Sequence, residues 1–181
     1  MTGSLWPWLL GVAVLSFWAL GAHNRVVALR GAVLAAWVPL DAVLQARGAA
    51  VGTLLAAIEQ PLKGEHQALE AARHAQAHVE QAAATLRRKP AAADAVGALA
   101  ASEAVWSGVM ARLVALVEQQ ADLRADAAVA PPLQLLQAQA PQWQFARQAF
   151  NEAGAAYNAA IAQFPTRLLC SLFSFEPAGR L

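Results

Sequence analysis

At 181 residues the chain is long enough for one domain with its own core. Hydrophobic residues make up 58% and charged residues 14%, whereas an ordinary soluble domain has about 25% charged residues. This excess of apolar residues indicates that part of the chain meets lipid. The formal net charge of +1 excludes a strong field for nucleic acid, and the single cysteine excludes an internal disulfide.

The first 22 residues predict a transmembrane anchor. Residues 5–22 are eighteen in a row without a charge, enough for about 27 Å of helix. Trp6, Trp8 and Trp18 suit the membrane interfaces. A cleaved signal peptide is the alternative, but residues 1–8 lack a basic residue and the apolar run is longer than is usual for a signal peptide. We therefore expect an uncleaved single-pass helix.

The charges after this segment predict its orientation. Arg25 and Arg30 follow the apolar run before the first acidic residue, Asp41. Because basic residues favour the cytoplasmic side, we expect the short N-terminus outside and the rest of the chain in the cytoplasm.

Beyond residue 22, three breaks divide the sequence into helical segments. The breaks are 60–64, with a proline and a glycine, Lys89-Pro90, and 126–132, which ends in two prolines. The predicted helices are 23–60, 64–88, 92–125 and 132–164, and the first continues from the anchor. Short connections between long helices favour an all-α, antiparallel four-helix bundle over residues 23–165.

Apolar residues at steps of three and four predict which helix faces are buried. In the second helix the larger apolar residues are few and alanines are many, so this helix should pack closely or fray. The predicted stripes are Trp37, Leu40, Leu44, Arg47, Val51, Leu54 and Ile58 in the first helix, Val105, Val109, Leu113, Leu116 and Leu123 in the third, and Leu133, Leu136, Trp143, Phe150, Tyr157 and Phe164 in the fourth.

Residues 166–181 form an apolar tail, with three leucines and two phenylalanines between positions 168 and 175. A segment of this composition is not expected to stay in water. It either docks on the bundle or lies on the membrane surface, and its few basic residues favour docking.

No pattern in the sequence indicates a catalytic site or a cofactor. Glu70, His74 and His78 lie one helical turn apart and form half a metal site at most, because zinc requires three or four protein ligands. We interpret them as exposed polar residues. Cys170 lies in an apolar stretch, where a thiol packs as a small hydrophobe. We therefore predict that the protein is not an enzyme and holds no cofactor or metal.

Polar residues inside the apolar seams form a separate group. Asn151 and Asn158 are one heptad apart and share a helix face. Buried amides at such positions fix the register of packed elements, and a binding groove is the alternative. The group consists of Asn24, Asp41, Arg147, Asn151 and Asn158.

Several motifs in order resemble the LemA family. They are Phe145-Ala146-Arg147-Gln148-Ala149-Phe150-Asn151, Tyr157-Asn158 and Gln163-Phe164-Pro165, together with residues 23–30 (which include Asn24 and Arg25), Ala36-Trp37, Leu40-Asp41 and, in the tail, Phe173-Ser174-Phe175 with Pro177. The resemblance spans nearly the whole chain. Its residues are therefore the structural or interaction candidates: Asn24, Arg25, Trp37, Asp41, Arg147, Asn151, Tyr157, Asn158, Phe164 and Pro165.

This resemblance implies a bacterial inner-membrane protein with one N-terminal span, a cytoplasmic four-helix bundle and no established enzymatic activity. We expect a noncatalytic interaction or scaffold protein with a membrane-organising or envelope role. Its partners would be the lipid bilayer and an unidentified membrane or cytoplasmic protein, or a second copy. The alternative is a ligand- or metal-binding membrane protein that uses polar groups in or on the bundle.

Overall fold

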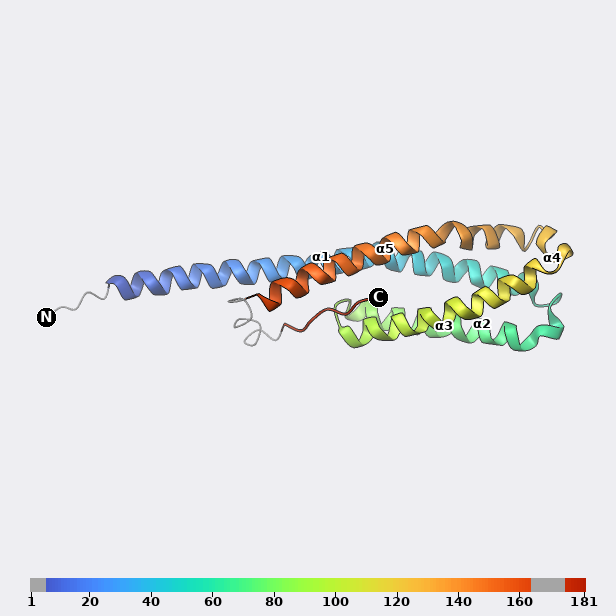
Figure 1. Ribbon diagram of the computed structural model, residues 1–181, viewed down its shortest axis with the longest axis horizontal. Coiled ribbons are helices and arrows are strands. Elements are labelled where there is room, and N and C mark those ends of the chain that lie inside the picture. Colours follow the sequence, from blue (N-terminus) through green and yellow to red (C-terminus); the bar gives the residue numbers. More distant parts are fainter. Residues whose placement is uncertain (1–5, 164–174) are drawn as a thin grey trace.

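The computed structural model describes residues 6–163 and 175–181, and nearly all of them are helical (Figure 1). The prediction of an all-α fold is confirmed, since the described residues form no strand beyond one isolated bridge between Ala92 and Ala178. The elements are α1 (Trp6–Ile58), the 3-10 turn η1 (Lys63–Glu65), α2 (His66–Arg88), α3 (Ala93–Glu118), α4 (Ala121–Ala125) and α5 (Ala130–Ala162).

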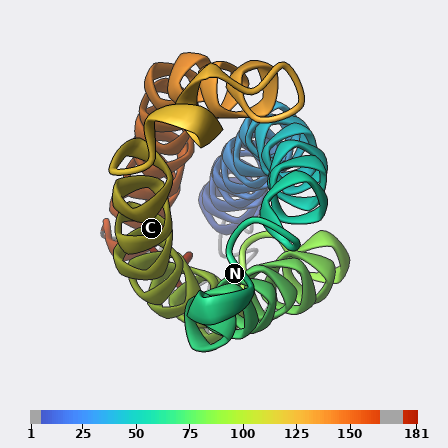
Figure 2. The same ribbon diagram turned by 90° about the vertical axis from the view of Figure 1, so that its right-hand side faces the viewer.

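The four long helices form an antiparallel bundle. α1 packs mainly on α5, and α2 packs mainly on α3. The end view shows the four helices side by side around a common axis (Figure 2). α1 is longer than its neighbours, and its first half projects beyond the bundle (Figure 1). It has no break at residue 22, so the prediction that the first bundle helix continues from the apolar segment is confirmed.

The three predicted breaks are confirmed, and the structure adds one that was not predicted, between α3 and α4. α1 ends before residue 60 and α2 ends at Arg88. The predicted helix 92–125 is wrong as one element, because α3 ends at Glu118 and α4 begins at Ala121. This break redirects the chain toward α5, which places Leu123 in the same core cluster as Leu133. α5 then begins with its two prolines in the first turn, as predicted.

The predicted stripe on α1 is confirmed, because all seven of its residues are buried. One of them is charged, Arg47. α2 packs closely through alanines such as Ala72 and Ala83, which let its backbone approach the neighbouring helices. The buried apolar residues of the bundle form two core clusters, and Arg47 is the one charged residue of the buried stripe on α1.

The stripe predicted for α3 is wrong at Val105, whose side chain is 61% exposed. The inward face instead contains Leu99, Trp106 and Met110, so that Trp106 and not the preceding Val105 faces the core. The steps of this face pass through Glu103. The prediction considered only apolar residues, so it did not recognise a seam that contains the acidic residue Glu103.

Two helices, α1 and α3, are long and apolar enough to cross a membrane by length and composition. In α1 the apolar residues before Gly21 are largely exposed, among them Trp8, Leu15 and Phe17. In α3 the inward face belongs to the bundle core. The exposed first part of α1 is compatible with a membrane anchor.

We predict that Leu113→Ala destabilises the protein by about 2–5 kcal/mol, because it leaves a cavity in the core. Val105→Ala, in the same helix, should change stability by less than about 0.5 kcal/mol because the side chain is exposed. Chemical unfolding of both full-length variants in detergent, followed by circular dichroism, measures the difference. Equal losses would contradict the observed face of α3.

Candidate functional site

Two asparagines on α5 hold an extended segment, residues 175–181, against the bundle. The Asn158 side chain donates to the Ala178 carbonyl oxygen at 2.9 Å and accepts from the Ala178 amide at 2.7 Å. Asn151 does the same with Leu181, at 2.8 and 2.9 Å. Each side-chain amide thus satisfies both backbone groups of one residue, as a neighbouring strand would. We call this arrangement the asparagine clamp.

Further contacts fix the position of the clamped segment. The Tyr157 hydroxyl donates to the Glu176 carbonyl oxygen at 3.0 Å. A Cβ atom on Gly179 would lie 2.5 Å from the Val96 Cβ atom, so only glycine permits this approach to α3. The prediction that the tail docks on the bundle is confirmed for residues 175–181, whereas its part before residue 175 lies outside the described residues.

Asn151 and Asn158 were also the candidates for a binding groove in the sequence analysis. Both amides are engaged at their oxygen and at their nitrogen. In the structure, therefore, Asn151 and Asn158 position a segment of their own chain.

The most buried ion pair of the described residues joins α1 to α3. Arg47 Nη2 donates to Glu103 Oε1, with 6% and 12% of the two side chains exposed. The guanidinium carbon lies 3.9 Å from the ring centroid of Trp106 and 5.0 Å from that of Trp143. One cation therefore links α1 with both α3 and α5.

The polar network extends from these indoles into α2. Trp106 Nε1 donates to Gln76 Oε1 at 2.8 Å, and Gln76 Nε2 donates to Glu80 at 2.8 Å. Gln76 is buried, so this bond gives its amide oxygen the partner that burial demands. The sequence analysis did not identify Glu103, Gln76 or Trp106 as site residues. The available signal was an acidic residue in the apolar seam of α3 and a basic residue in that of α1.

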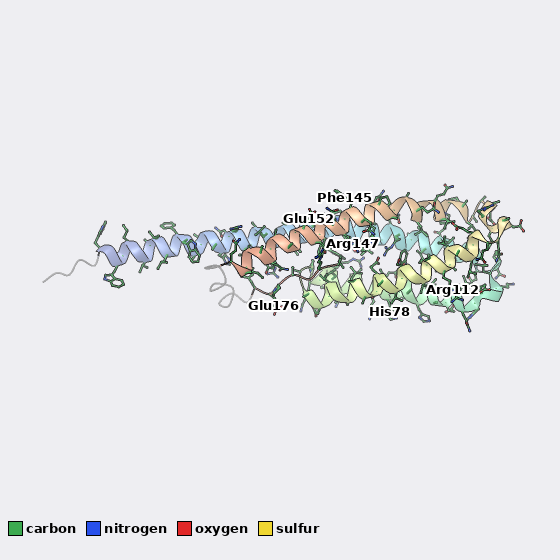
Figure 3. The ribbon with its side chains drawn as sticks, in the orientation of Figure 1. His78, Arg112, Phe145, Arg147, Glu152 and Glu176 are labelled. Carbon is green, nitrogen blue, oxygen red and sulfur yellow. The ribbon has the colours of Figure 1, made fainter. Side chains whose placement is uncertain are left out.

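The remaining sequence candidates lie apart from one another. The expectation that Asn24 and Arg147 sit inside the seams is wrong, because both are exposed, as is Arg25. Arg147 lies at the edge of the bundle, on the side of α5 that faces α3 (Figure 3). Phe164 and Pro165 lie outside the described residues.

Two candidates make structural contacts between helices. Trp37 is buried and packs edge-on against Phe150, with ring centroids 6.2 Å apart. Asp41 accepts from Arg87 Nε at 2.9 Å at both carboxylate oxygens, which ties α1 to α2. The hydrogen bond that Arg87 donates to this carboxylate raises the pKa of Arg87.

The histidine face of α2 does not assemble a metal site. Glu70 bonds to Arg73 at 2.5 Å, and this hydrogen bond lowers the pKa of Glu70. His74 and His78 are exposed, and His78 lies on the outside of the bundle (Figure 3). Among residues 6–163 and 175–181, no three His, Cys, Asp or Glu side chains converge as metal ligands would.

The fold and the site define an all-α protein with a long apolar first helix and a four-helix bundle that binds its own extended segment. The family model described as the LemA family matches residues 36–181, which include the clamp and the buried ion pair. The chain belongs to the LemA family. A comparison with curated proteins finds no match.

We predict that Asn158→Ala releases the segment from the bundle, because the Ala178 N–H and C=O groups both lose their side-chain partner. Hydrogen exchange at the amides of residues 178–181 should become faster, while exchange in α2 stays unchanged. Gln148→Ala, an exposed change on the same helix, is the control. Unchanged exchange in Asn158→Ala would show that the clamp does not hold the segment.

We predict that Glu103→Ala destabilises the protein by about 3–5 kcal/mol, because it leaves the Arg47 charge buried without its partner. The double change Arg47→Met with Glu103→Leu should recover most of this loss, since apolar residues of similar volume replace the pair. Unfolding of both variants by denaturant measures this. A double variant that is less stable than Glu103→Ala would contradict the account.

Proposed function

We propose that the protein is a noncatalytic, membrane-anchored interaction module. Residues 1–22 anchor it in the inner membrane of a bacterium, with the short N-terminus outside and the bundle in the cytoplasm. The exposed apolar residues of α1 support the anchor, and Arg25 and Arg30 support the orientation. Membership of the LemA family is compatible with this role.

One observation carries the proposal: an exposed apolar stripe on α1, just beyond the anchor. Val27, Leu34 and Val38 are 47%, 42% and 67% exposed, and Gly31 lies between them on the same face. Their steps of four, three and four residues are those of a helix that packs on another helix. Leu34 lies at the border of this stripe, where it lines a hollow with Arg88 and Phe175, yet its side chain is 42% exposed. The buried seam of α1 lies on another face, so the stripe is available to a partner.

The stripe continues toward the anchor with the same steps, through Asn24, Leu20 and Phe17. All three are exposed. A single asparagine in an otherwise apolar seam pairs best with the same residue of a parallel helix. Copies inserted into one membrane in one direction are parallel, so the partner best matched to this surface is a second copy. A different membrane or cytoplasmic protein with an apolar helix is the alternative partner.

A cysteine cross-linking experiment tests the stripe. In a Cys170→Ser background, Leu34→Cys should form a cross-linked dimer in native membranes, whereas Ala35→Cys, which is also exposed but lies one residue off the stripe, should not. Leu34→Glu should lower the mass of the detergent-purified protein from dimer to monomer by light scattering, and Ala35→Glu should leave it unchanged.

A wild-type monomer with equal cross-linking at positions 34 and 35 would refute self-association. Co-purification from the same membranes then separates the two partner classes. A protein retained by the wild type and by Ala35→Glu, but lost from Leu34→Glu, is the partner of the stripe. If no protein shows this pattern, the stripe is not an interaction surface.

A further inference from the structure

A cavity of about 580 Å³ lies between α3 and α5, on the side of the bundle where these two helices do not pack on each other. Its size falls in the range of about 300–1,000 Å³ that is typical of small-molecule sites. The lining is mostly apolar, from Leu136 and several alanines, with the two indoles of Trp106 and Trp143. The Arg47 side chain lies at its inner end, between these indoles.

Two buried polar side chains that line this cavity have unmet hydrogen bonds. Arg47 and Gln139 are each 5% exposed. The Nε atom of Arg47, a donor, and the Oε1 atom of Gln139, an acceptor, have no partner among the described residues. Buried polar groups are normally paired, and a leucine at position 139 would suit the apolar lining better. The glutamine therefore indicates an occupant that supplies hydrogen bonds.

The charge at the edge of the cavity adds a third requirement. Arg147 lines the cavity, is exposed, and has no acidic partner within ion-pair distance among the described residues. Glu103 also lines it, but its charge is balanced by Arg47. Among the charged side chains that line the cavity, only Arg147 is thus unpaired, and its positive charge favours an anionic group on the occupant.

We propose that this cavity binds a small planar compound that carries an adjacent N–H and C=O pair, as in a lactam or imide, and a carboxylate. The flat ring lies among the apolar and indole side chains. The ligand N–H donates to Gln139 Oε1, and the ligand C=O accepts from Arg47 Nε. The terminal torsion of Gln139 is soft, so its amide can turn to present either its oxygen or its nitrogen to the ligand. Arg147 meets the carboxylate. This site is separate from the α1 stripe and does not depend on it.

The test uses orotate as the probe, because it is planar, has the imide pair and is an anion. Uracil lacks the charge and benzoate lacks the imide pair. Equilibrium dialysis against full-length protein in lipid nanodiscs, with empty nanodiscs as background, measures binding of each. We expect orotate to bind at least about tenfold more tightly than either of the others, since each lacks one of the polar interactions.

Two matched substitutions on α5 locate the site. Gln139→Leu should weaken orotate binding by about tenfold or more and leave the melting temperature equal or higher, because it removes an unpaired buried amide. Gln148→Leu, the same change at an exposed position outside the cavity, should leave binding unchanged. Arg147→Gln should weaken orotate binding and leave uracil binding unchanged.

The outcomes are decisive because Gln139→Leu is expected to fold. Equal binding of orotate to the wild type and to Gln139→Leu would overturn the proposal. Absence of orotate and uracil binding to the wild type would also overturn it. A drop in melting temperature for Gln139→Leu would assign the amide to the fold instead of to a ligand.

Discussion

The contact on which the middle of the bundle depends is the buried ion pair of Arg47 and Glu103. α3 and α5 do not pack directly on each other there, and the gap between them is bridged by one guanidinium group between two indoles. A buried charge without a partner is costly, so α1 and α3 must keep the register that brings Arg47 and Glu103 together. The pair thus fixes geometry, while the apolar seams above and below it supply most of the stability.

This arrangement explains why the bundle has a cavity at all. Apolar seams close tightly, as the residues around Leu54 and Leu113 do. At the level of Arg47, a charged side chain and two indoles keep the helices apart, and the space beside them is lined by Gln139 and Arg147. Toward its other end Leu181 also lines the space, so the clamped segment forms part of the same wall. The asparagine clamp and the ion pair together shape one region of α5.

The sequence predicted the fold well, because apolar periodicity and prolines act locally. The α1 stripe, the breaks after α1 and α2 and the start of α5 all followed from such signals. The face of α3 was misplaced because Glu103 occupies a core position and the exposed Val105 imitates one. The break at residues 119–120 has no proline or glycine to mark it.

The candidate site was harder to predict than the fold, for a related reason. Asn151 and Asn158 were recognised as sharing a face, but their partners are backbone groups of residues 178 and 181, which no spacing rule connects to α5. Gln139 and Gln76 are polar residues in helices rich in glutamine and alanine, and only the structure distinguishes the buried ones.

Because α1 is one helix from Trp6 to Ile58, it connects these local features to one another. The same helix carries the exposed apolar stripe as far as Val38, the inward seam from Val26 onward and the ion pair at Arg47. α1 continues as one helix past Pro39, a residue type that kinks helices, so the orientation of its first half contributes to the orientation of the bundle without fixing it alone. Asp41 binds Arg87 three residues after the stripe ends, which ties α2 to α1 at that level. Pairing of two copies along the stripe would therefore place both bundles, and both cavities, at a defined height above the membrane.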